Sequence, residues 1–492
     1  MNILLVNPEI PDTFWSFRNA LKFIAKKSSE PPLGLLTVAA MLPTEWNKQL
    51  VDLNVSRLKD ETIRWADYVF LTGMAIQRDS FVEVVKRCNQ LGRKVVAGGP
   101  MCTMDADEFP GVDHLVLNEA EVTLPLFIKD LLAGHPQKRY ESNVFPDISS
   151  TPIPRWELLE IDKYATMSLQ YSRGCPFNCD FCTVTLLNGH KPRTKSSRQF
   201  LAELQSLYDL GWRGGVFIVD DNFIGNRRQV KTDLLPALIQ WSEKHRYPFN
   251  FITEASINLA DDDELIDLMV RAGFDSAFIG IETVASESLS ECGKSQNINR
   301  DMVSAVQKLH QHGIMVSGGF IVGFDNDPVS IFDQLIRFIQ KSGIVTAMVG
   351  LLNAPKGTAL YRKLQEQNRL LKDMSGNNMD GSLNFIPRME YQTLINGYHK
   401  ILHSVYGPRA YYERVKNFLK TYRFSSKGKI TFSFRNIQAL VKSMWILGVV
   451  ERGRIYYWKL FFYSLLKHPR KFALSITLAI YGFHFRRVVE AV

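Results

Sequence analysis

Cysteine is scarce in this chain of 492 residues, and the six that occur are unevenly spread. Three fall between residues 175 and 182, whereas Cys88, Cys102 and Cys292 are isolated, which excludes a disulfide framework. Uninterrupted apolar runs are also short, and none reaches the roughly 18 residues of a membrane span. The first residues lack the basic stretch of a signal peptide. We therefore expect a cytoplasmic protein, and its length predicts two or three domains.

Acidic residues are rare only near the C-terminal end. From Arg409 to Val492 the sequence has 17 Lys and Arg against 3 Asp and Glu, a net charge of +14. The preceding part has 42 basic and 47 acidic residues, a net charge of −5, so the overall charge of +9 originates in the tail. Contact with an anionic partner is therefore expected of the tail and not of the body.

The three clustered cysteines, Cys175, Cys179 and Cys182, have C-x3-C-x2-C spacing and follow a strand-like run at residues 165–171. Three thiolates on one loop can hold three irons of a [4Fe–4S] cluster, and no fourth cysteine follows at ferredoxin spacing. The fourth iron would then be open for chemistry. Zinc is the competing metal, but zinc sites usually have paired C-x2-C knuckles and four ligands. Buried structural cysteine is a further alternative. The spacing favours a cluster with these three ligands.

This loop, with Phe181 before the third cysteine, resembles the signature of the radical S-adenosylmethionine (SAM) enzymes. In that family the open iron binds the amino and carboxylate groups of SAM. Electron transfer from the cluster cleaves SAM to methionine and a 5′-deoxyadenosyl radical. The resemblance implies a [4Fe–4S] cluster and SAM as cofactors, Phe181 among the SAM contacts, and a reductant such as flavodoxin or ferredoxin.

Residues 1–140 alternate between strand-like and helical patterns, which predicts a doubly wound, Rossmann-like parallel sheet. Expected strands are 3–6, 49–53, 68–72, 94–97 and 114–117, and expected helices are 33–42, 80–91 and 122–133. Ligands of such sheets bind at the carboxyl ends of the strands. The candidate residues there are Asn7, Pro8, Thr72, Gly73, Gly98, Gly99, Pro100, Glu119 and Glu121. Ordinary turn chemistry is the alternative explanation for the glycines.

Placed before a radical SAM loop, this domain resembles the cobalamin-binding domain of the B12-dependent radical SAM class. Cobalamin domains that supply a histidine to cobalt use D-x-H-x-x-G after an early strand. Here His114 and His135 both lie outside such a context. The resemblance implies that cobalamin would bind with no protein histidine on cobalt.

A linker rich in Pro and Ser is expected at residues 141–164, followed by six strand–helix units at residues 165–356. These units resemble the partial (β/α)6 barrel of radical SAM enzymes, whose sites lie at the strands' carboxyl ends. Carboxylates and hydroxyls suit the ammonium group and ribose of SAM, and a glycine-flanked strand resembles the family's adenine-binding G-x-I-x-G. The candidate SAM contacts are Asp220, Asp221, Glu254, Ser256, Glu282, Gly319, Ile321 and Gly323.

Each of these acids is also a candidate helix cap, and Asn326 stands where some family members have a glutamate. His310 and His312 are expected to be solvated residues at a helix end. No catalytic side chain beyond the cofactor contacts is assigned.

Residues 357–492 are expected to form a helical domain whose last part mixes aromatic with basic residues. Basic amphipathic helices with Trp and Tyr suit an anionic membrane surface. A helical cap packed on the barrel is an equally good interpretation, and the two are compatible. The apolar content argues against nucleic acid as a partner.

The order of these parts resembles the B12-dependent radical SAM subfamily that contains the hopanoid C-2 methylases. The resemblance is carried by residues 2–8, 31–35, 220–223 and 280–283. It implies a methyltransferase in which one SAM methylates cobalamin, a second supplies the hydrogen-abstracting radical, and the methyl group passes to an unactivated carbon. The substrate would be a lipid such as a hopanoid, which would place the enzyme in the cytoplasm, at the inner face of the membrane.

Three rivals remain open: a radical cyclase or ring-rearranging enzyme without net methyl transfer, a methylthiotransferase, and a cobalamin-responsive regulatory protein with a structural cluster. The second would need three N-terminal cysteines, and only Cys88 and Cys102 occur there.

Overall fold

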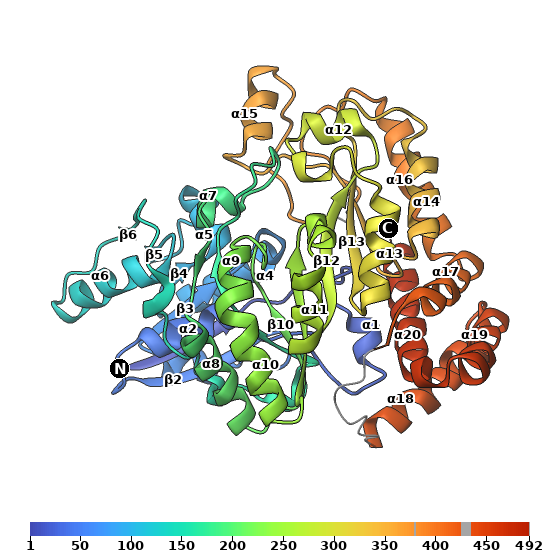
Figure 1. Cartoon of the computed structure of the whole chain (residues 1–492). Helices are drawn as coiled ribbons and strands as arrows, with labels where there is room; N and C mark the ends of the chain where they lie inside the picture. The colour runs from blue at the N-terminus through green and yellow to red at the C-terminus, as the bar shows by residue number, and fades with distance from the viewer. Residues whose placement is uncertain (378–379, 425–433, 492) are drawn as a thin grey trace.

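A computed structural model of the chain describes residues 1–377, 380–424 and 434–491. Two parallel sheets form its framework (Figure 1). The first, blue to cyan in Figure 1, has the order β2-β1-β3-β4-β5-β6. Its strands are β1 (Asn2–Asn7), β2 (Asn47–Asp52), β3 (Tyr68–Thr72), β4 (Lys94–Gly98), β5 (His114–Val116) and β6 (Arg139–Tyr140). The order reverses direction at β1, as in a doubly wound fold, so the predicted fold class is confirmed for this part.

Helices cover both faces of this sheet because β1, β3 and β4 are buried apolar runs. The short helix α1 (Arg18–Leu21) follows β1 and packs against the C-terminal part of the chain. The others are α2 (Leu33–Met41), α3 (Asp60–Trp65), α4 (Arg78–Gln90), α5 (Pro100–Met104) and α6 (Ala120–Leu132). The predicted helices correspond to α2, α4 and α6.

The second sheet has the order β14-β13-β12-β11-β10-β7, which is sequential and entirely parallel. Its strands are β7 (Thr166–Leu169), β10 (Gly214–Ile218), β11 (Phe249–Ala255), β12 (Phe274–Glu282), β13 (Met315–Val322) and β14 (Ala347–Leu351). A separate two-stranded ribbon joins β8 (Ser172–Arg173) to β9 (Arg193–Thr194) behind the cysteine loop. This is the expected partial (β/α)6 barrel.

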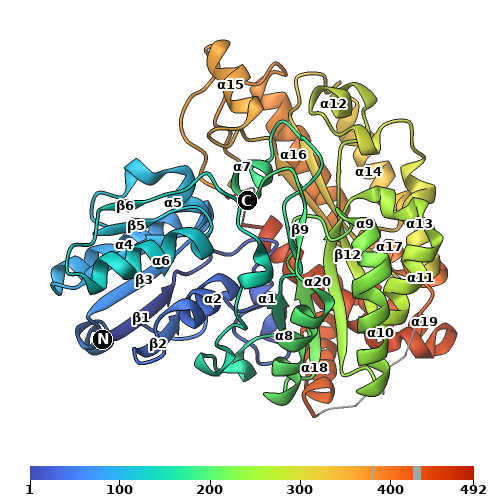
Figure 2. The ribbon, with the colours of Figure 1, turned by 60° about the vertical axis from the view of Figure 1, so that its left-hand side comes forward.

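Helices pack side by side on the outside of the second sheet (Figure 2). They are α8 (Ser197–Asp209), α10 (Leu235–Lys244), α11 (Asp263–Ala272), α13 (Met302–His312) and α14 (Ile331–Ser342). Three short helices, α7 (Val184–Asn188), α9 (Arg227–Gln229) and α12 (Ser286–Glu291), lie in the segments that connect these units. A π-helical turn at Val230–Leu234 separates α9 from α10. The N-cap of α11 is Asp262, whose side chain accepts a hydrogen bond from Leu265 N (3.0 Å).

The C-terminal helices are part of the barrel's core. They are α15 (Ala359–Glu366), α16 (Tyr391–Tyr406), α17 (Pro408–Thr421), α18 (Phe434–Trp445), α19 (Arg454–Lys467) and α20 (Phe472–Val489). Helix α16 lies against β14, and α20 packs on α16, α17 and α1. Arg414 is completely buried and donates to Val405 O (3.0 Å). The helical-cap interpretation is therefore confirmed for α16, α17 and α20.

One helix segment, Pro469–Val489, is long and apolar enough by composition to cross a membrane, which the sequence did not lead us to expect. Its 18-residue window is 67% buried inside the protein, as in a core helix. His484 on α20 is buried against Phe17, which follows β1. The segment thus joins the two ends of the chain.

The expectation that His310 is solvated is wrong. The side chain on α13 is fully buried against the ring of Phe418, and neither ring nitrogen has a hydrogen-bond partner among the described residues. Burial lowers the pKa of His310 to about 3. His312, by contrast, is partly exposed beside Asp267.

Burial of a neutral histidine makes stability fall in acid. Below the unfolded-state pKa of about 6.5 the unfolded chain takes up a proton that folded His310 refuses, so unfolding is favoured by up to about 1.4 kcal/mol per pH unit. We expect His310→Leu to lose this dependence between about pH 6.5 and pH 4, while His135→Gln, at an exposed position, behaves like the wild type. Urea unfolding at pH 7 and pH 5 measures the difference. An equal change in the free energy of unfolding between pH 7 and pH 5 for the wild type and His310→Leu would contradict it.

Candidate active site

The cysteine loop leaves the carboxyl end of β7 and is held by two acids that follow β10. Asp220 accepts hydrogen bonds from Tyr171 N (2.7 Å), Ser172 N (2.8 Å) and Ser172 Oγ (2.6 Å). Asp221 accepts from Gly174 N (2.8 Å) and Asn188 Nδ2 (3.0 Å). Burial raises the pKa of Asp220 to about 7. Both carboxylates thus position the loop, and their predicted contact with SAM stays a prediction.

The three thiols share one short loop and are the donor type of an iron–sulfur cluster, although no group of three or more His, Cys, Asp or Glu side chains among the described residues is arranged to hold a metal ion. Cys175, Cys179 and Cys182 are half-buried on one loop, and no disulfide joins any described cysteines. Gly174 allows the loop's tight entry because its φ is +96° and a Cβ would lie 2.9 Å from the carbonyl oxygens of Gly189 and Lys191. Burial raises the pKa of all three thiols, that of Cys182 to about 12. Binding iron would therefore displace protons from them.

A buried cation stands beside these thiols. The turn after α12 packs on the cysteine loop, because Asp180 N donates to Cys292 O (3.0 Å). Lys294 at this turn donates to Glu282 Oε1 (2.6 Å). Burial opposes the charge of Lys294, but Glu282 and Cys179 raise its pKa above the usual value. The positive charge offsets the negative charge of cluster ligands, one of the factors that set a cluster's potential.

Glu282 itself has a strained backbone. It ends β12 at a register shift between Gly280 and Glu282, and its φ is 63°, a left-handed conformation that non-glycine residues rarely adopt. A Cβ at Gly280 would come within 2.8 Å of Lys294 Nζ. The sequence identified Glu282 as a candidate but not Lys294, which lies in no recognisable motif.

A cavity of about 400 Å³ opens at the carboxyl ends of β12, β13 and β14. Of the predicted SAM contacts, Phe181, Glu282, Gly319 and Ile321 line it. A Cβ at Gly319 would meet the ring of Phe278 at 2.8 Å, so glycine is needed where the strand faces this ring. Gly323 does not line the cavity; it makes the turn after β13 with a φ of +108°.

Residues that the sequence did not single out complete this cavity. Thr13, Phe14 and Trp15 follow β1, Ile76 follows β3, and residues 374–377 form a loop before α16. Asn353 and Pro355 come from the loop that follows β14. Among the described residues of the lining, Glu282 is the one with a charged side chain. The first sheet's ligand edge and the barrel's mouth therefore share one apolar space.

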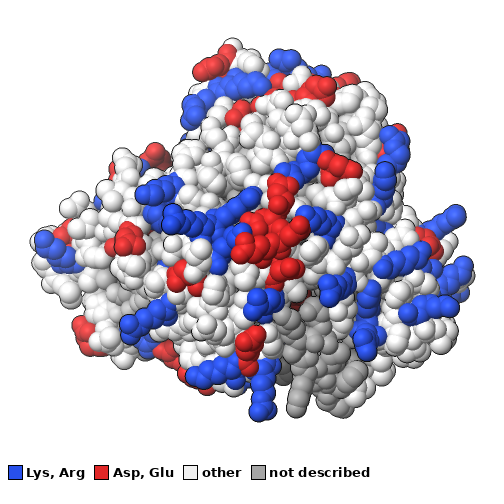
Figure 3. Space-filling view, viewed as in Figure 1, with Lys and Arg blue, Asp and Glu red and all other residues white. Residues whose placement is uncertain are grey.

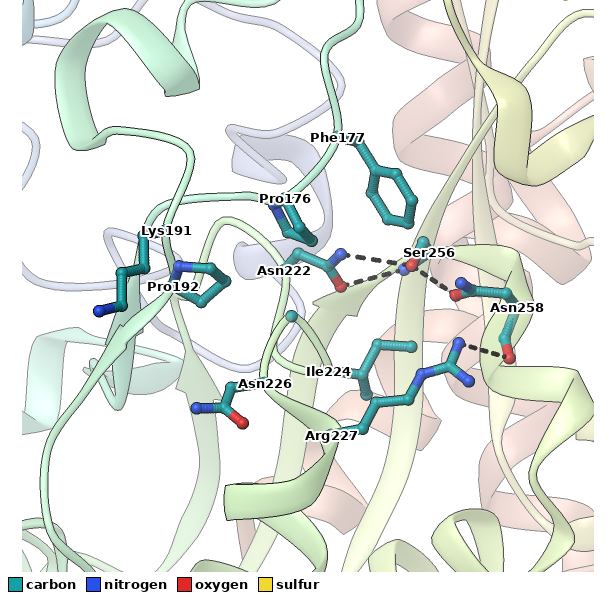
Figure 4. Close-up of a pocket in the computed structure, with 11 residues that line it drawn as sticks. Pro176, Phe177, Lys191, Pro192, Asn222, Ile224, Asn226, Arg227, Ser256 and Asn258 are labelled. Carbon is teal, nitrogen blue, oxygen red and sulfur yellow. Dashed lines mark hydrogen bonds between the residues drawn. The ribbon is translucent and has the colours of Figure 1, made fainter.

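The other predicted SAM contacts lie elsewhere. Ser256 lines a second cleft, of about 420 Å³, beside Pro176 and Phe177 of the cysteine loop (Figure 4). There Ser256 Oγ donates to Asn258 Oδ1 (2.7 Å) and accepts from Asn222 Nδ2 (3.3 Å). Glu254 lines neither cavity; burial, with the charges of Asp221 and Glu30 as smaller causes, raises its pKa to about 8. Of the predicted SAM contacts, four line the first cavity and Ser256 lines the second, whereas Asp220, Asp221, Glu254 and Gly323 line neither.

Most of the candidate cobalamin contacts make contacts within the protein itself. Asn7 donates to Asp52 Oδ1 (3.0 Å), and the carbonyl of Pro8 accepts from Gln77 Nε2 (2.7 Å). A Cβ at Gly98 would clash with Val116 O, and one at Gly99 with Thr72 Oγ1. These glycines are therefore required by the fold, whatever ligand binds. Pro100 is the first residue of α5, and a Cβ at Gly73 would meet Met101 Cε at 3.1 Å.

Glu119 and Glu121 connect the first sheet to the cysteine loop. Arg173, two residues before Cys175, pairs with Glu119 (2.6 Å) and Glu121 (2.8 Å), and Arg193 pairs with Glu119 (2.6 Å). All four side chains are at most 15% exposed. These acids were predicted as cofactor contacts, whereas in the structure they pair with two arginines of the β8–β9 ribbon.

We expect Arg173→Met to destabilise the fold by about 3–5 kcal/mol, because it leaves two buried carboxylates short of a partner. Arg139→Met is the matched control. Arg139 forms exposed pairs with Asp107 and Glu141, and its loss should cost at most about 1 kcal/mol. Urea unfolding measures both, and iron content reports on the loop. Equal effects of the two substitutions would contradict the structural role of the pair.

Comparison with known proteins agrees with this geometry. The Radical SAM superfamily matches residues 169–339, and a domain of unknown function (DUF4070) matches residues 358–492. An uncharacterized methyltransferase of Synechocystis sp. is 43% identical over 100% of this chain and 92% of its own length. The hopanoid C-2 methylase of Rhodopseudomonas palustris is 31% identical over 93% of this chain and 88% of its own length.

The chain belongs to the radical SAM methyltransferases. Membership identifies it as an enzyme, which confirms the expectation drawn from the cysteine loop. The [4Fe–4S] cluster and SAM are the cofactors that define the family, and the three-thiol donor set fits the cluster.

The fold of this radical SAM methyltransferase also has solved counterparts. The cobalamin-dependent SAM radical enzyme OxsB, with aqua-cobalamin bound, has a TM-score of 0.61 at 15% identity over 100% of this chain and 80% of its own. The methyltransferase TsrM from Kitasatospora setae, with cobalamin and a [4Fe–4S] cluster bound, has a TM-score of 0.59 at 16% identity, covering 81% of this chain and 84% of its own. The likeness confirms the overall fold, with both sheets and the helical part.

Proposed function

We propose that this enzyme is a cobalamin-dependent methyltransferase that methylates an unactivated carbon of a lipid such as a hopanoid, at C-2. The observation that carries the proposal is the apolar cavity between the two sheets. Its lining includes Phe14, Phe181 and the tilted pair of Trp15 and Phe278, whose ring centroids are 4.9 Å apart. Such a lining suits a flat, apolar substrate better than a charged one. The hopanoid C-2 methylase among the relatives supports this choice.

Cobalamin is proposed to bind at the carboxyl edge of the first sheet, near Asn7, Pro8, Thr72 and Gly73. This edge faces the barrel, because the segments that follow β1 and β3 line the shared cavity. His114 begins β5 at the opposite edge, with Nδ1 against Gln137 O (2.6 Å), and His135 is exposed. We therefore propose that cobalt receives no histidine from the described residues.

When bound, the [4Fe–4S] cluster would supply the electron for cleavage of SAM, and cobalamin would donate the methyl group. The protein's part is to align and exclude water: Asp220 and Asp221 hold the cysteine loop, the Arg173 pairs hold the first sheet against it, and the aromatic lining keeps the cavity dry. We propose that SAM contacts Phe181, Gly319, Ile321 and Glu282. The candidates Glu254, Ser256 and Gly323, which do not line the shared cavity, are proposed with less support. Flavodoxin or ferredoxin is the proposed reductant, in the cytoplasm.

The substrate is tested by expressing the chain in a host that makes unmethylated hopanoids and comparing lipid masses. A hopanoid carrying one additional methyl group, absent with the variant that lacks all three loop cysteines, is expected. A rearranged lipid of unchanged mass would favour the ring-rearranging alternative. Unaltered lipids from a protein that retains iron and cleaves SAM would reject the lipid substrate while leaving the radical chemistry intact.

A further inference from the structure

Large apolar side chains are exposed along one face of α18 and the helical turn after it. Ile437, Val441, Trp445 and Val449 are 52%, 59%, 64% and 47% exposed, and they recur every four residues, so they form one stripe. The opposite face is buried: Ala439 and Leu447 lie in the core, and Ser443 is bonded to Tyr457 OH (2.9 Å). The stripe is thus a defined face of a packed helix.

Helix α19 presents a second stripe. Ile455, Phe462 and Leu466 are 63%, 54% and 75% exposed and occur at helical spacing, with Leu465 (42%) beside them. Its inner face is fixed by Tyr457, Leu460 and Ser464, of which Ser464 accepts from Ser475 Oγ on α20 (2.8 Å).

The two stripes belong to one rigid unit. Trp458 Nε1 on α19 donates to Gly448 O (2.9 Å), and the indole lies where a Cβ on Gly448 would stand. We name the nine exposed residues of this unit the apolar face: Ile437, Val441, Trp445, Val449, Val450, Ile455, Phe462, Leu465 and Leu466. A monomeric protein rarely exposes so many large apolar side chains together, which points to a partner.

Charge decides the kind of partner. Residues 436–471 contain seven Lys and Arg and a single acid, Glu451. Glu451 is 14% exposed and pairs with Arg487 (2.6 Å), whereas Arg452, Arg454, Lys459, Lys467 and Arg470 are exposed on the same segment as the apolar face. We call these five bases its basic rim. Lys and Arg are visible at the right-hand edge of Figure 3, where α19 lies. A second copy would bring like charges together, whereas an anionic bilayer offers both apolar depth and negative charge.

We propose that the apolar face of α18 and α19, with its basic rim, docks the enzyme on an anionic lipid bilayer. The apolar side chains enter the interfacial region and the rim contacts headgroups. The proposal extends the proposed function, because an enzyme that methylates a membrane lipid needs access to the bilayer. The apolar face itself is defined by exposure and charge, without reference to the substrate. Because α17 and α20 are core elements, removing the whole tail would unfold the enzyme and cannot serve as the test.

The test is sedimentation of the full-length, iron-loaded protein with vesicles of phosphatidylcholine, with or without phosphatidylglycerol. Wild type should bind the anionic vesicles and be partly released by salt, since exposed charges are screened within about 8–10 Å at physiological ionic strength. Val441→Ser/Trp445→Ser/Leu466→Ser should lower the vesicle-bound to free ratio at least about tenfold. Arg452→Gln/Arg454→Gln/Lys459→Gln should remove the salt-sensitive part.

The matched control is Val82→Ser/Leu126→Ser/Leu132→Ser, three similarly exposed residues (49%, 50% and 63%) on the first domain's helices, and should bind like wild type. SAM cleavage without vesicles should be the same in every variant, which separates docking from catalysis and from folding. Absent binding by wild type, equal binding by the apolar-face variant, or a wild-type dimer that this variant dissociates would each overturn the proposal. Loss of lipid methylation with vesicle binding intact would reject the substrate and not the docking face.

Discussion

Replacing Cys175, Cys179 and Cys182 together by alanine is expected to abolish reductive cleavage of SAM and to leave the protein without its cluster iron. The three thiolates are the expected ligands of three of the four irons in the cluster, so the triple substitution removes every cysteine ligand that the loop provides. The first sheet has its own buried core, built on residues such as Val69 and Val95, and should remain folded. Iron analysis, SAM cleavage by reconstituted protein and circular dichroism measure the three expectations.

Cys292→Ala is the sharpest control, because this cysteine stands next to the loop without belonging to it. Its Sγ lies 3.6 Å from Leu289 O, and the residue is 2% exposed. The variant should retain iron and cleavage near the wild-type level. Loss of the cluster in Cys292→Ala would mean that a fourth thiol ligates it. SAM cleavage by the triple variant would refute the assignment of the loop.

Asp220→Ala is expected to damage both stability and iron retention strongly. It leaves three donors, Tyr171 N, Ser172 N and Ser172 Oγ, without their acceptor, and each unsatisfied buried group costs about 1–3 kcal/mol. We therefore expect a loss of at least about 3 kcal/mol in the free energy of unfolding, together with poor iron retention. Urea unfolding and iron analysis after anaerobic reconstitution measure both.

The matched control for this substitution is Asp209→Ala. Asp209 is exposed at the end of α8 and accepts one hydrogen bond from Gln205 Nε2 (2.8 Å), so its loss should change stability by no more than about 0.5 kcal/mol. If Asp220→Ala were as stable and iron-replete as Asp209→Ala, the carboxylate would not be what holds the loop. Its role would then have to be sought in ligand contact, as the sequence first indicated.

The architecture could be predicted from the sequence because the buried parallel strands consist of runs of apolar residues. The expected strand 68–72 coincides with β3, and 94–97 differs from β4 by one residue. The two-residue edge strand β6 and the short helix α3 were missed, since neither is long enough to show a period. The domain boundaries at residues 140, 164 and 356 stay a prediction. The strands of the first sheet precede the expected linker, and those of the second follow it.

The site was less predictable, for a physical reason. A carboxylate at a strand end can be recognised in sequence, but its partner cannot, because Glu121 and Arg173 are 52 residues apart and Asp220 and Ser172 are 48 apart. From their positions at strand ends, Asp220, Glu119 and Glu121 were therefore predicted to contact ligands. In the structure their carboxylates bond to groups of the protein itself. Trp15 and Lys294 belong to no motif, and only packing brings Trp15 to the cavity and Lys294 to Glu282 in its lining.

We propose that this enzyme transfers a methyl group from SAM to an unactivated carbon by radical chemistry. Incubation of the reconstituted enzyme with cobalamin, a reductant, hopanoid-containing vesicles and SAM whose methyl group is fully deuterated tests this transfer. We expect a methylated lipid that keeps all the deuterium of the methyl group, with 5′-deoxyadenosine and S-adenosylhomocysteine formed in equal amounts. Formation of 5′-deoxyadenosine with no labelled methyl group in any lipid would contradict it.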